Sequence, residues 1–314
     1  MTTHGDSHNS EDAAARLLQM PLEVRTRELM RLYDIRPRRS LSQNFLTAEG
    51  AVDQIVSTLL QAASADACHI EIGAGLGALT VPLAQSGRQV VAFETDEALI
   101  EPLTLLMRPF ENVAVRHADV TEVNLGSLAS DRALAIVGNL PYHLSGLLLR
   151  QLMEAGRGCE VIVVTAQTEV AERLAAGPGE EQYGMLSVFA AYYLADIAPI
   201  CDIGPGAFHP QPTVDSTALR LTPVQRGEEF PGGRPPEQRP MLAETIRAAF
   251  GHRRKTLRNA LALGLQQVEK SDITEALLAA DVDSSLRAEK LDIHDFSRIA
   301  GELARITGEV GSDA

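Results

Sequence analysis

The sequence has 314 residues, of which 45% are hydrophobic and 22% are charged, as is usual for a globular protein. No apolar run is long enough to cross a membrane, and three widely separated cysteines are typical of reduced thiols in a cytoplasmic protein, not of a disulfide framework or a metal site. The formal net charge of −14 argues by itself against a nucleic-acid partner, but two dense basic runs interrupt the acidic background, "RPRRS" at 36–40 and "HRRKTLRN" at 252–259.

The first part of the chain is polar and acidic, and we expect residues 1–27 to form a disordered tail. Residues 51–63 have helical apolar spacing. Strand-like segments then alternate with helix-like ones. The first strand is expected at the start of residues 68–87, and the others are expected within residues 88–96, 112–120, 132–142 and 159–167. Strands that alternate with helices of this length predict a parallel sheet covered on both faces, so we expect an α/β domain over residues 28–222.

Beyond residue 194 the pattern changes. Residues 195–223 suggest two strands around a loop rich in proline and glycine, as in an antiparallel addition to the sheet edge. Residues 223–240 are polar and rich in the same two residue types, which predicts a linker loop. Helical spacing from 241 onward predicts a small all-α domain over residues 241–314.

A glycine turn follows the first strand of the sheet, in "EIGAGLGAL". Gly73 and Gly75 would let the backbone approach a ligand closely, and Glu94 ends the next strand, where an acid can accept hydrogen bonds from ribose hydroxyls. The turn therefore predicts a nucleotide-like cofactor. Because Gly73, Gly75 and Ala78 also satisfy the dinucleotide-binding pattern, a nicotinamide enzyme stays open on this motif alone.

The ends of the next two strands favour a methyl donor over a nicotinamide. Asp119 would accept a hydrogen bond from an adenine amino group, and Asn139 begins an Asn-Leu-Pro-Tyr stretch over the same cleft. Hydride transfer does not need such a stretch, whereas methylation of a planar amino nitrogen does. The nitrogen of an adenine amine is a poor nucleophile, because its lone pair is delocalised into the ring.

The residues of "NLPY" suit this task. The amide oxygen of Asn139 and the carbonyl of Leu140 could accept the two N6–H bonds, while Pro141 fixes the backbone between them and Tyr142. Tyr142 offers a flat face on which the base can stack, a contact that contributes roughly 1–3 kcal/mol. Phe208 is the candidate for the other face of the base, with an ordinary core phenylalanine as the alternative.

These pieces together resemble the KsgA/RsmA family, the ribosomal small-subunit RNA adenine N6-dimethyltransferases, over residues 36–303. The motifs that carry the resemblance are "SQNFL" (42–46), "EIGAGLGALT" (71–80), "FETD" (93–96), "NLPY" (139–142), "EVAERLAAGPG" (169–179), "YGMLSV" (183–188), "AFHPQPTVDS" (207–216), "FGHRRKTLRNAL" (250–261) and "RAEKL" (287–291). Several are weak singly, but so many in the right order are specific.

The resemblance implies a Rossmann-like sheet that binds S-adenosylmethionine, with a helical C-terminal domain that binds RNA. It implies cofactor contacts at Asn44, Leu46, Gly73, Gly75, Glu94, Asp119 and Asn139, the last of which would face the methyl group. The implied reaction is four methyl transfers, two to each of two adjacent adenosines near the 3′ end of 16S rRNA in an immature small subunit. A cytoplasmic monomer is expected.

The sequence departs from the family pattern at several positions. Ser42 replaces a glycine before "QNFL", Thr168 and Thr213 stand where lysines are usual, His143 follows "NLPY", and Asp292 follows "RAEKL". The loss of two lysines near the cleft should weaken phosphate contacts. RNA affinity and choice of site are therefore the properties that these departures affect.

The basic run at 252–259 is the expected RNA contact. We predict that Arg253, Arg254, Lys255 and Arg258 lie on a helix, with Arg254 and Arg258 on one face, and bind phosphates. The alternative is a structural role for these side chains. Two alternative functions also stay open: a 23S rRNA adenine methylase of the macrolide-resistance type, and a non-catalytic ribosome-assembly or transcription factor on the same fold.

Overall fold

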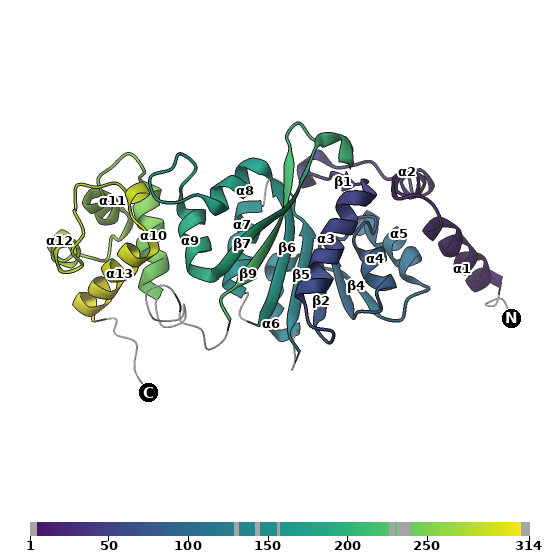
Figure 1. The fold of residues 1–314 in the computed structure, drawn as a ribbon, viewed down its shortest axis with the longest axis horizontal. Coiled ribbons are helices and arrows are strands. Elements are labelled where there is room, and N and C mark those ends of the chain that lie inside the picture. Colours follow the sequence, from purple (N-terminus) through teal and green to yellow (C-terminus); the bar gives the residue numbers. More distant parts are fainter. Residues whose placement is uncertain are drawn as a thin grey trace. The chain divides into compact units, whose positions relative to one another are not determined.

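The computed structural model describes residues 5–128, 132–141, 145–155, 158–225, 230 and 240–308 (Figure 1). The chain divides into two compact units. The first unit comprises Met1–Ala171 with Asp196–Gln225, and the second comprises Glu172–Ala195 with Arg226–Ala314. No helix among the described residues is long and apolar enough to span a membrane.

A seven-stranded sheet with the order β4-β3-β2-β5-β6-β9-β7 forms the centre of the first unit. Its strands are β2 (Cys68–Ile72), β3 (Val90–Glu94), β4 (Val113–His117), β5 (Leu134–Asn139), β6 (Cys159–Gln167), β7 (Leu194–Ile203) and β9 (Ser216–Pro223). Strands β2 to β6 are parallel, and β9 runs antiparallel to β6. Both the parallel sheet and its antiparallel addition are therefore confirmed. The strand order reverses between β2 and β5, the position at which open α/β sheets bind ligands.

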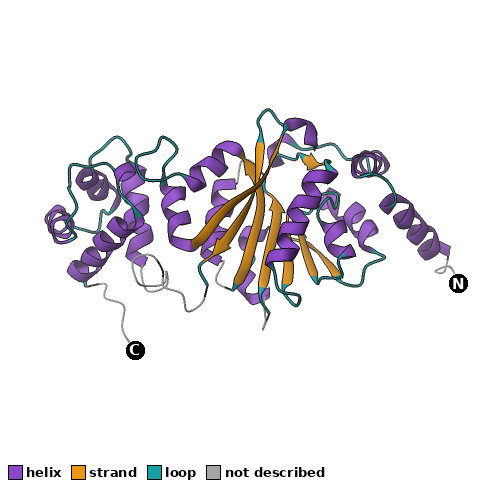
Figure 2. Cartoon of the chain, viewed as in Figure 1, coloured by secondary structure: helices purple, strands orange, loops and turns teal. Residues whose placement is uncertain are grey.

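Helices cover both faces of this sheet (Figure 2). Helices α3 (Glu49–Ala62), α4 (Thr80–Gln85) and α5 (Glu97–Met107) contact its strands. Helices α6 (Leu125–Leu128), α7 (Ser145–Ala155) and α8 (Thr168–Ala175) follow β4, β5 and β6 in the chain. Helix α3 buries Ile55 and Leu59 against Val137 and its neighbours on one face. Helix α5 buries Leu103 with Ala92 on the other face. The apolar spacing that predicted these helices is thus the spacing that forms the two cores.

Short elements complete the first unit. Strands β1 (Phe45–Leu46) and β8 (Phe208–His209) pair antiparallel as a separate two-stranded sheet, with Leu46 opposite Phe208. Single 3₁₀ turns are η1 (Arg39–Leu41), η2 (Val120–Glu122) and η3 (Pro205–Ala207). The β1–β8 pair brings the "QNFL" segment beside the proline-rich loop, although more than 150 residues separate them in the chain.

The expected disordered tail over residues 1–27 is wrong where the structure describes it. Helix α1 (Gly5–Leu18) and helix α2 (Leu22–Leu32) occupy most of this segment. Leu17 and Leu29 are buried in the same core as Leu103 of α5. The prediction rested on the acidic composition of the segment and overlooked its amphipathic pattern. Burial of the leucines of α1 and α2 stabilises the two helices.

The second unit is helical, as expected for its C-terminal part. It contains α9 (Met185–Tyr193), α10 (Pro240–Gly251), α11 (Leu257–Gly264), α12 (Lys270–Ala279), η5 (Ala288–Lys290) and α13 (Ile293–Thr307). The expected boundary at residue 222 differs from the observed one, because α9 packs on α10 and α13. Of the expected linker over 223–240, Phe230 is buried against Tyr192, and residues 226–229 and 231–239 lie outside the described residues.

Candidate functional site

The glycine turn after β2 has the conformation that its sequence predicts. Gly73, Gly75 and Gly77 have φ angles of 70°, 55° and 79°, a region that side-chain-bearing residues rarely adopt. A Cβ atom on Gly75 would lie 3.3 Å from the ring of Phe45, so this position also needs the space that glycine leaves. The backbone of the turn therefore forms an open floor for a ligand at the carboxyl end of β2.

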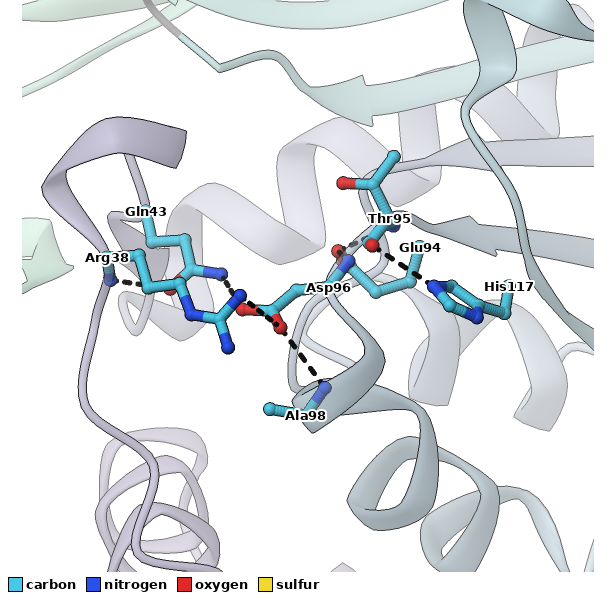
Figure 3. A network of polar contacts seen from close by, with 7 residues as sticks. All are labelled: Arg38, Gln43, Glu94, Thr95, Asp96, Ala98 and His117. Carbon is cyan, nitrogen blue, oxygen red and sulfur yellow. Dashed lines mark hydrogen bonds and ion pairs between the residues drawn. The ribbon is translucent and has the colours of Figure 1, made fainter.

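Glu94 lies beside this turn at the end of β3. Its side chain is buried, and its Oε2 atom accepts a hydrogen bond from the backbone N–H of Gly75 at 2.8 Å. Its Oε1 atom accepts from the N–H groups of Thr95 and Asp96, each at 2.8 Å (Figure 3). Burial raises the pKa of this carboxyl, and the three N–H donors partly offset that effect. Each carboxylate oxygen can accept more than one hydrogen bond, so capacity remains for ribose hydroxyls.

Asn139 ends β5 and has a fixed orientation. Its Nδ2 donates to the backbone carbonyl of Asn44 at 3.0 Å. Its Oδ1 atom is buried and has no hydrogen-bond partner among the described residues. A buried acceptor without a donor is costly, because it has lost its water without gaining a protein partner. This amide oxygen is therefore suited to a ligand that carries N–H groups.

One cavity of the first unit brings most of the predicted site together. Its walls come from α2, residues 41–46, the glycine turn and the ends of β3 and β5. The predicted residues that line it are Asn44, Leu46, Gly73, Gly75, Glu94, Asn139 and Leu140. The cavity therefore lies at the carboxyl ends of the parallel strands, where the strand order reverses.

Two predicted residues that the structure describes, Asp119 and Phe208, do not line this cavity. Asp119 is exposed, and its Oδ1 atom accepts from the N–H and the hydroxyl of Thr121 at 2.8 and 2.7 Å, which caps η2. Phe208 is only 2% exposed and belongs to the core around Leu46, so the alternative of a core phenylalanine is the arrangement observed. Burial of an apolar ring removes the flat face that stacking needs. Tyr142 lies outside the described residues.

The sequence reasoning missed Glu71, which also lines the cavity. Its side chain is 1% exposed, and its Oε2 atom has no partner among the described residues. Burial raises the pKa of this carboxyl to about 8, and the nearby charge of Glu94 adds to the increase. An acid inside the buried strand "CHIEI" was the signal for it. Gln43 lines the same cavity and was also missed.

The predicted basic helix is wrong in its secondary structure. Residues 252–255 form a turn between α10 and α11, and only Arg258 lies on α11, so the inferred helical face does not exist. All four basic side chains are exposed, and Arg253 donates to the carbonyl of Tyr183 at 3.3 Å. No ion pair involves Arg254, Lys255 or Arg258 among the residues that the structure describes. The turn and the start of α11 therefore present cations that no carboxylate of the described residues pairs with.

No group of three or more potential metal-binding side chains occurs within the described part of the chain.

The sequence profile of ribosomal RNA adenine dimethylases matches residues 35–305. The chain belongs to this family. The ribosomal RNA small subunit methyltransferase A of Bacillus pumilus is 35% identical to it over 90% of this chain and 96% of its own length. The enzyme of the same name from Ligilactobacillus salivarius is 36% identical over 90% and 95%.

Two solved structures have the same fold. A dimethyladenosine transferase from Plasmodium falciparum superposes with a TM-score of 0.62 and 21% identity, covering 85% of this chain and 98% of its own. The 23S rRNA methyltransferase ErmE superposes with a TM-score of 0.58 and 22% identity, covering 83% and 99%. At these identities the two structures support the methyltransferase fold alone.

As a member of this dimethylase family, the chain is an S-adenosylmethionine-dependent methyltransferase. The cavity fits that cofactor, because the glycine turn leaves backbone space and Glu94 accepts hydrogen bonds beside it. When bound, the cofactor supplies a sulfonium methyl group. The Oδ1 atom of Asn139, for which the described residues provide no hydrogen-bond partner, belongs to a residue that lines the same cavity.

Proposed function

We propose that this protein methylates N6 of two adjacent adenosines near the 3′ end of 16S rRNA, twice each, in an immature small ribosomal subunit. The observation that carries the proposal is the buried Oδ1 atom of Asn139, a cavity-lining residue, for which no described residue supplies a hydrogen-bond donor. The two bacterial relatives, both named as small-subunit methyltransferases, support the choice of subunit.

The target amine would be held by two acceptors. Asn139 Oδ1 and the carbonyl of Leu140 accept the two N6–H bonds, which directs the nitrogen lone pair toward the methyl group. The N–H of Leu140 donates to the backbone carbonyl of Thr165 in β6 at 3.1 Å, and Pro141 has no N–H that could compete. The base must leave its stack to reach this position, and Tyr142 would receive it. Orientation of two reactants can lower a barrier by about 7–11 kcal/mol. The N6–CH₃ bond forms as the S–CH₃ bond breaks and S-adenosylhomocysteine leaves. The methylated nitrogen is then acidic enough to lose its proton to water, so no strong base is needed.

The basic turn (residues 252–255 with Arg258) is the proposed RNA contact. It explains how a chain with a net charge of −14 binds a polyanion, because salt screens the distant acidic residues beyond roughly 8–10 Å. Thr168 stands where a lysine is usual, and its hydroxyl lies 3.1 Å from that of Thr217 on β9. With no cation at that position, the turn carries more of the phosphate binding.

The enzyme is proposed to work as a monomer in the cytoplasm. A monomer that needs no metal is proposed, because the sulfonium methyl group of S-adenosylmethionine is already activated. Ribosomal subunits mature in the cytoplasm of bacteria, so the enzyme is expected there.

The decisive experiment is mass spectrometry of 16S rRNA from cells that lack this protein. We expect the dimethyladenosine near the 3′ end to disappear, to return with the wild-type gene, and not to return with Asn139→Ala. Dimethyladenosine at normal levels in the deletion strain would contradict the proposal.

A second candidate is methylation of 23S rRNA, which the fold shared with ErmE favours. Purified unmodified small and large subunits, each incubated with radiolabelled S-adenosylmethionine, separate the two. Label in the small-subunit RNA supports the first proposal, and label in the large-subunit RNA supports the second.

A further inference from the structure

Residues 38–46, which we call the strap, form one wall of the cofactor cavity. Its residues 41–46 line the cavity and include Asn44 and Leu46. The C-terminal end of the strap is held by the two-stranded β1–β8 sheet. Leu46 pairs with Phe208, and the backbone N–H of Thr47 donates to the carbonyl of Ala207 at 2.8 Å. The N-terminal end, which follows the buried Ile35, pairs with no strand among the described residues. The side chains of Arg38 and Gln43 attach that end to Asp96, which follows β3 and Glu94 in the chain.

Both residues bind one carboxylate, that of Asp96 (Figure 3). Arg38 Nη1 lies 3.2 Å from Asp96 Oδ1, and Gln43 Nε2 donates to Asp96 Oδ2 at 2.7 Å. Within the strap, the backbone N–H of Arg38 donates to Gln43 Oε1 at 2.8 Å. The two side chains thus reach Asp96 as one folded unit, and Asp96 is only 3% exposed.

Asp96 needs neither of these partners for its local role. It caps the N-terminus of α5 by accepting from the N–H of Ala98 at 3.1 Å. A cap uses one oxygen, whereas here both oxygens also bind the strap. The N–H of the same residue donates to Glu94 Oε1 at 2.8 Å. Asp96 therefore joins the residue that faces the ribose to the segment that covers the cavity.

We propose that Asp96 is a positioning residue that holds the strap over the bound cofactor, so that its contacts with Arg38 and Gln43 set the rate of cofactor exchange. The cofactor can leave past the strap only when both contacts break. The strap also carries the Asn44 carbonyl that binds Asn139 Nδ2. This inference rests on the cavity being the S-adenosylmethionine site.

The test measures dissociation of S-adenosylhomocysteine from the full-length protein by surface plasmon resonance. Arg38→Gln removes the ion pair and leaves the helix cap intact, and we expect dissociation to become about three- to tenfold faster. Gln43→Glu places a second carboxylate against Asp96 and should accelerate dissociation more. The matched control is Arg36→Gln, because Arg36 pairs with the exposed Asp34 and does not line the cavity. Its dissociation rate should equal that of the wild type.

Two further measurements separate this role from a general loss of stability. Dissociation from the wild type should accelerate with added salt, and Arg38→Gln should remove that dependence at an unchanged melting temperature. Wild-type dissociation rates in both Arg38→Gln and Gln43→Glu would overturn the proposal, and so would an equal acceleration in Arg36→Gln. If the wild type bound no S-adenosylhomocysteine, or Glu94→Ala did not change its affinity, the assignment of the cavity itself would fail instead.

Discussion

Replacement of Asn139 by alanine tests the centre of the proposed mechanism. The substitution removes two polar atoms with different environments. Oδ1 is the buried acceptor that has no donor among the described residues, and Nδ2 donates to the carbonyl of Asn44. The two losses should appear in different measurements.

The loss of Oδ1 should act on the chemical step. A preorganised hydrogen-bonding group that stabilises a transition state in a buried site contributes about 10²–10³ in kcat, or roughly 3–4 kcal/mol. The loss of Nδ2 leaves the Asn44 carbonyl without its donor, which should cost about 1–3 kcal/mol of folding stability. Cofactor affinity should change by only a few-fold, because the amide acts mainly on the target nitrogen.

Single-turnover methylation of unmodified small subunits gives the rate of methyl transfer, and calorimetry gives the affinity for S-adenosylmethionine. Asn44→Ala is the matched control. It keeps the backbone carbonyl that orients Asn139 and removes only a side chain that donates to the carbonyl of Ser42 at 3.1 Å. It should raise KM for the cofactor while kcat stays within a few-fold. A near-normal methylation rate for Asn139→Ala at saturating cofactor would refute the role of the amide.

Three further predictions concern the remaining charged residues. Glu94→Ala should weaken S-adenosylmethionine binding by about 1.5–3 kcal/mol. It should also lower the melting temperature, because three backbone N–H groups lose their acceptor. Unchanged affinity by calorimetry would remove Glu94 from the site. Arg254→Glu with Lys255→Glu should weaken binding to unmodified small subunits. The slope of the logarithm of the binding constant against the logarithm of salt concentration should fall by about 0.7–0.9 for each lost phosphate contact. A lower melting temperature with intact RNA binding would instead indicate a structural role and move the RNA contact to "RPRRS". The folded protein holds a proton on Glu71, whose pKa is about 8, above that of an unfolded glutamate, so its contribution to stability is present at low pH and is lost as the pH rises toward 8. Glu71→Gln should therefore be more stable than the wild type at pH 8 and close to it at pH 5; parallel curves of melting temperature against pH would contradict this.

Part of the site could be predicted because it depends on neighbours in the chain. The glycines of "EIGAGLG" must adopt positive φ to leave β2, and Glu94 must end the next strand once the apolar pattern stops. Parallel strands place their carboxyl ends at one edge, so Asn139 had to lie over the same crevice. The same local reasoning wrongly predicted a helix for the basic turn. The residues after "AAF" continue a helical pattern in the sequence. In the structure, however, the backbone N–H of Leu257 donates to the carbonyl of Leu286, which is distant in the chain.

The sequence by itself determined the fold class, the strand ends that carry the ligand-binding residues, and the residue types of the site. These features follow from local backbone geometry and apolar spacing. Only the tertiary structure decided which of those residues face the cavity. Phe208 is buried because it pairs opposite Leu46, and Asn139 directs its oxygen inward because a carbonyl 95 residues away in the chain accepts its N–H. Asp96 holds the strap through Gln43, 53 residues away. Contacts across such distances depend on how the whole chain packs, and no local pattern of residues encodes them.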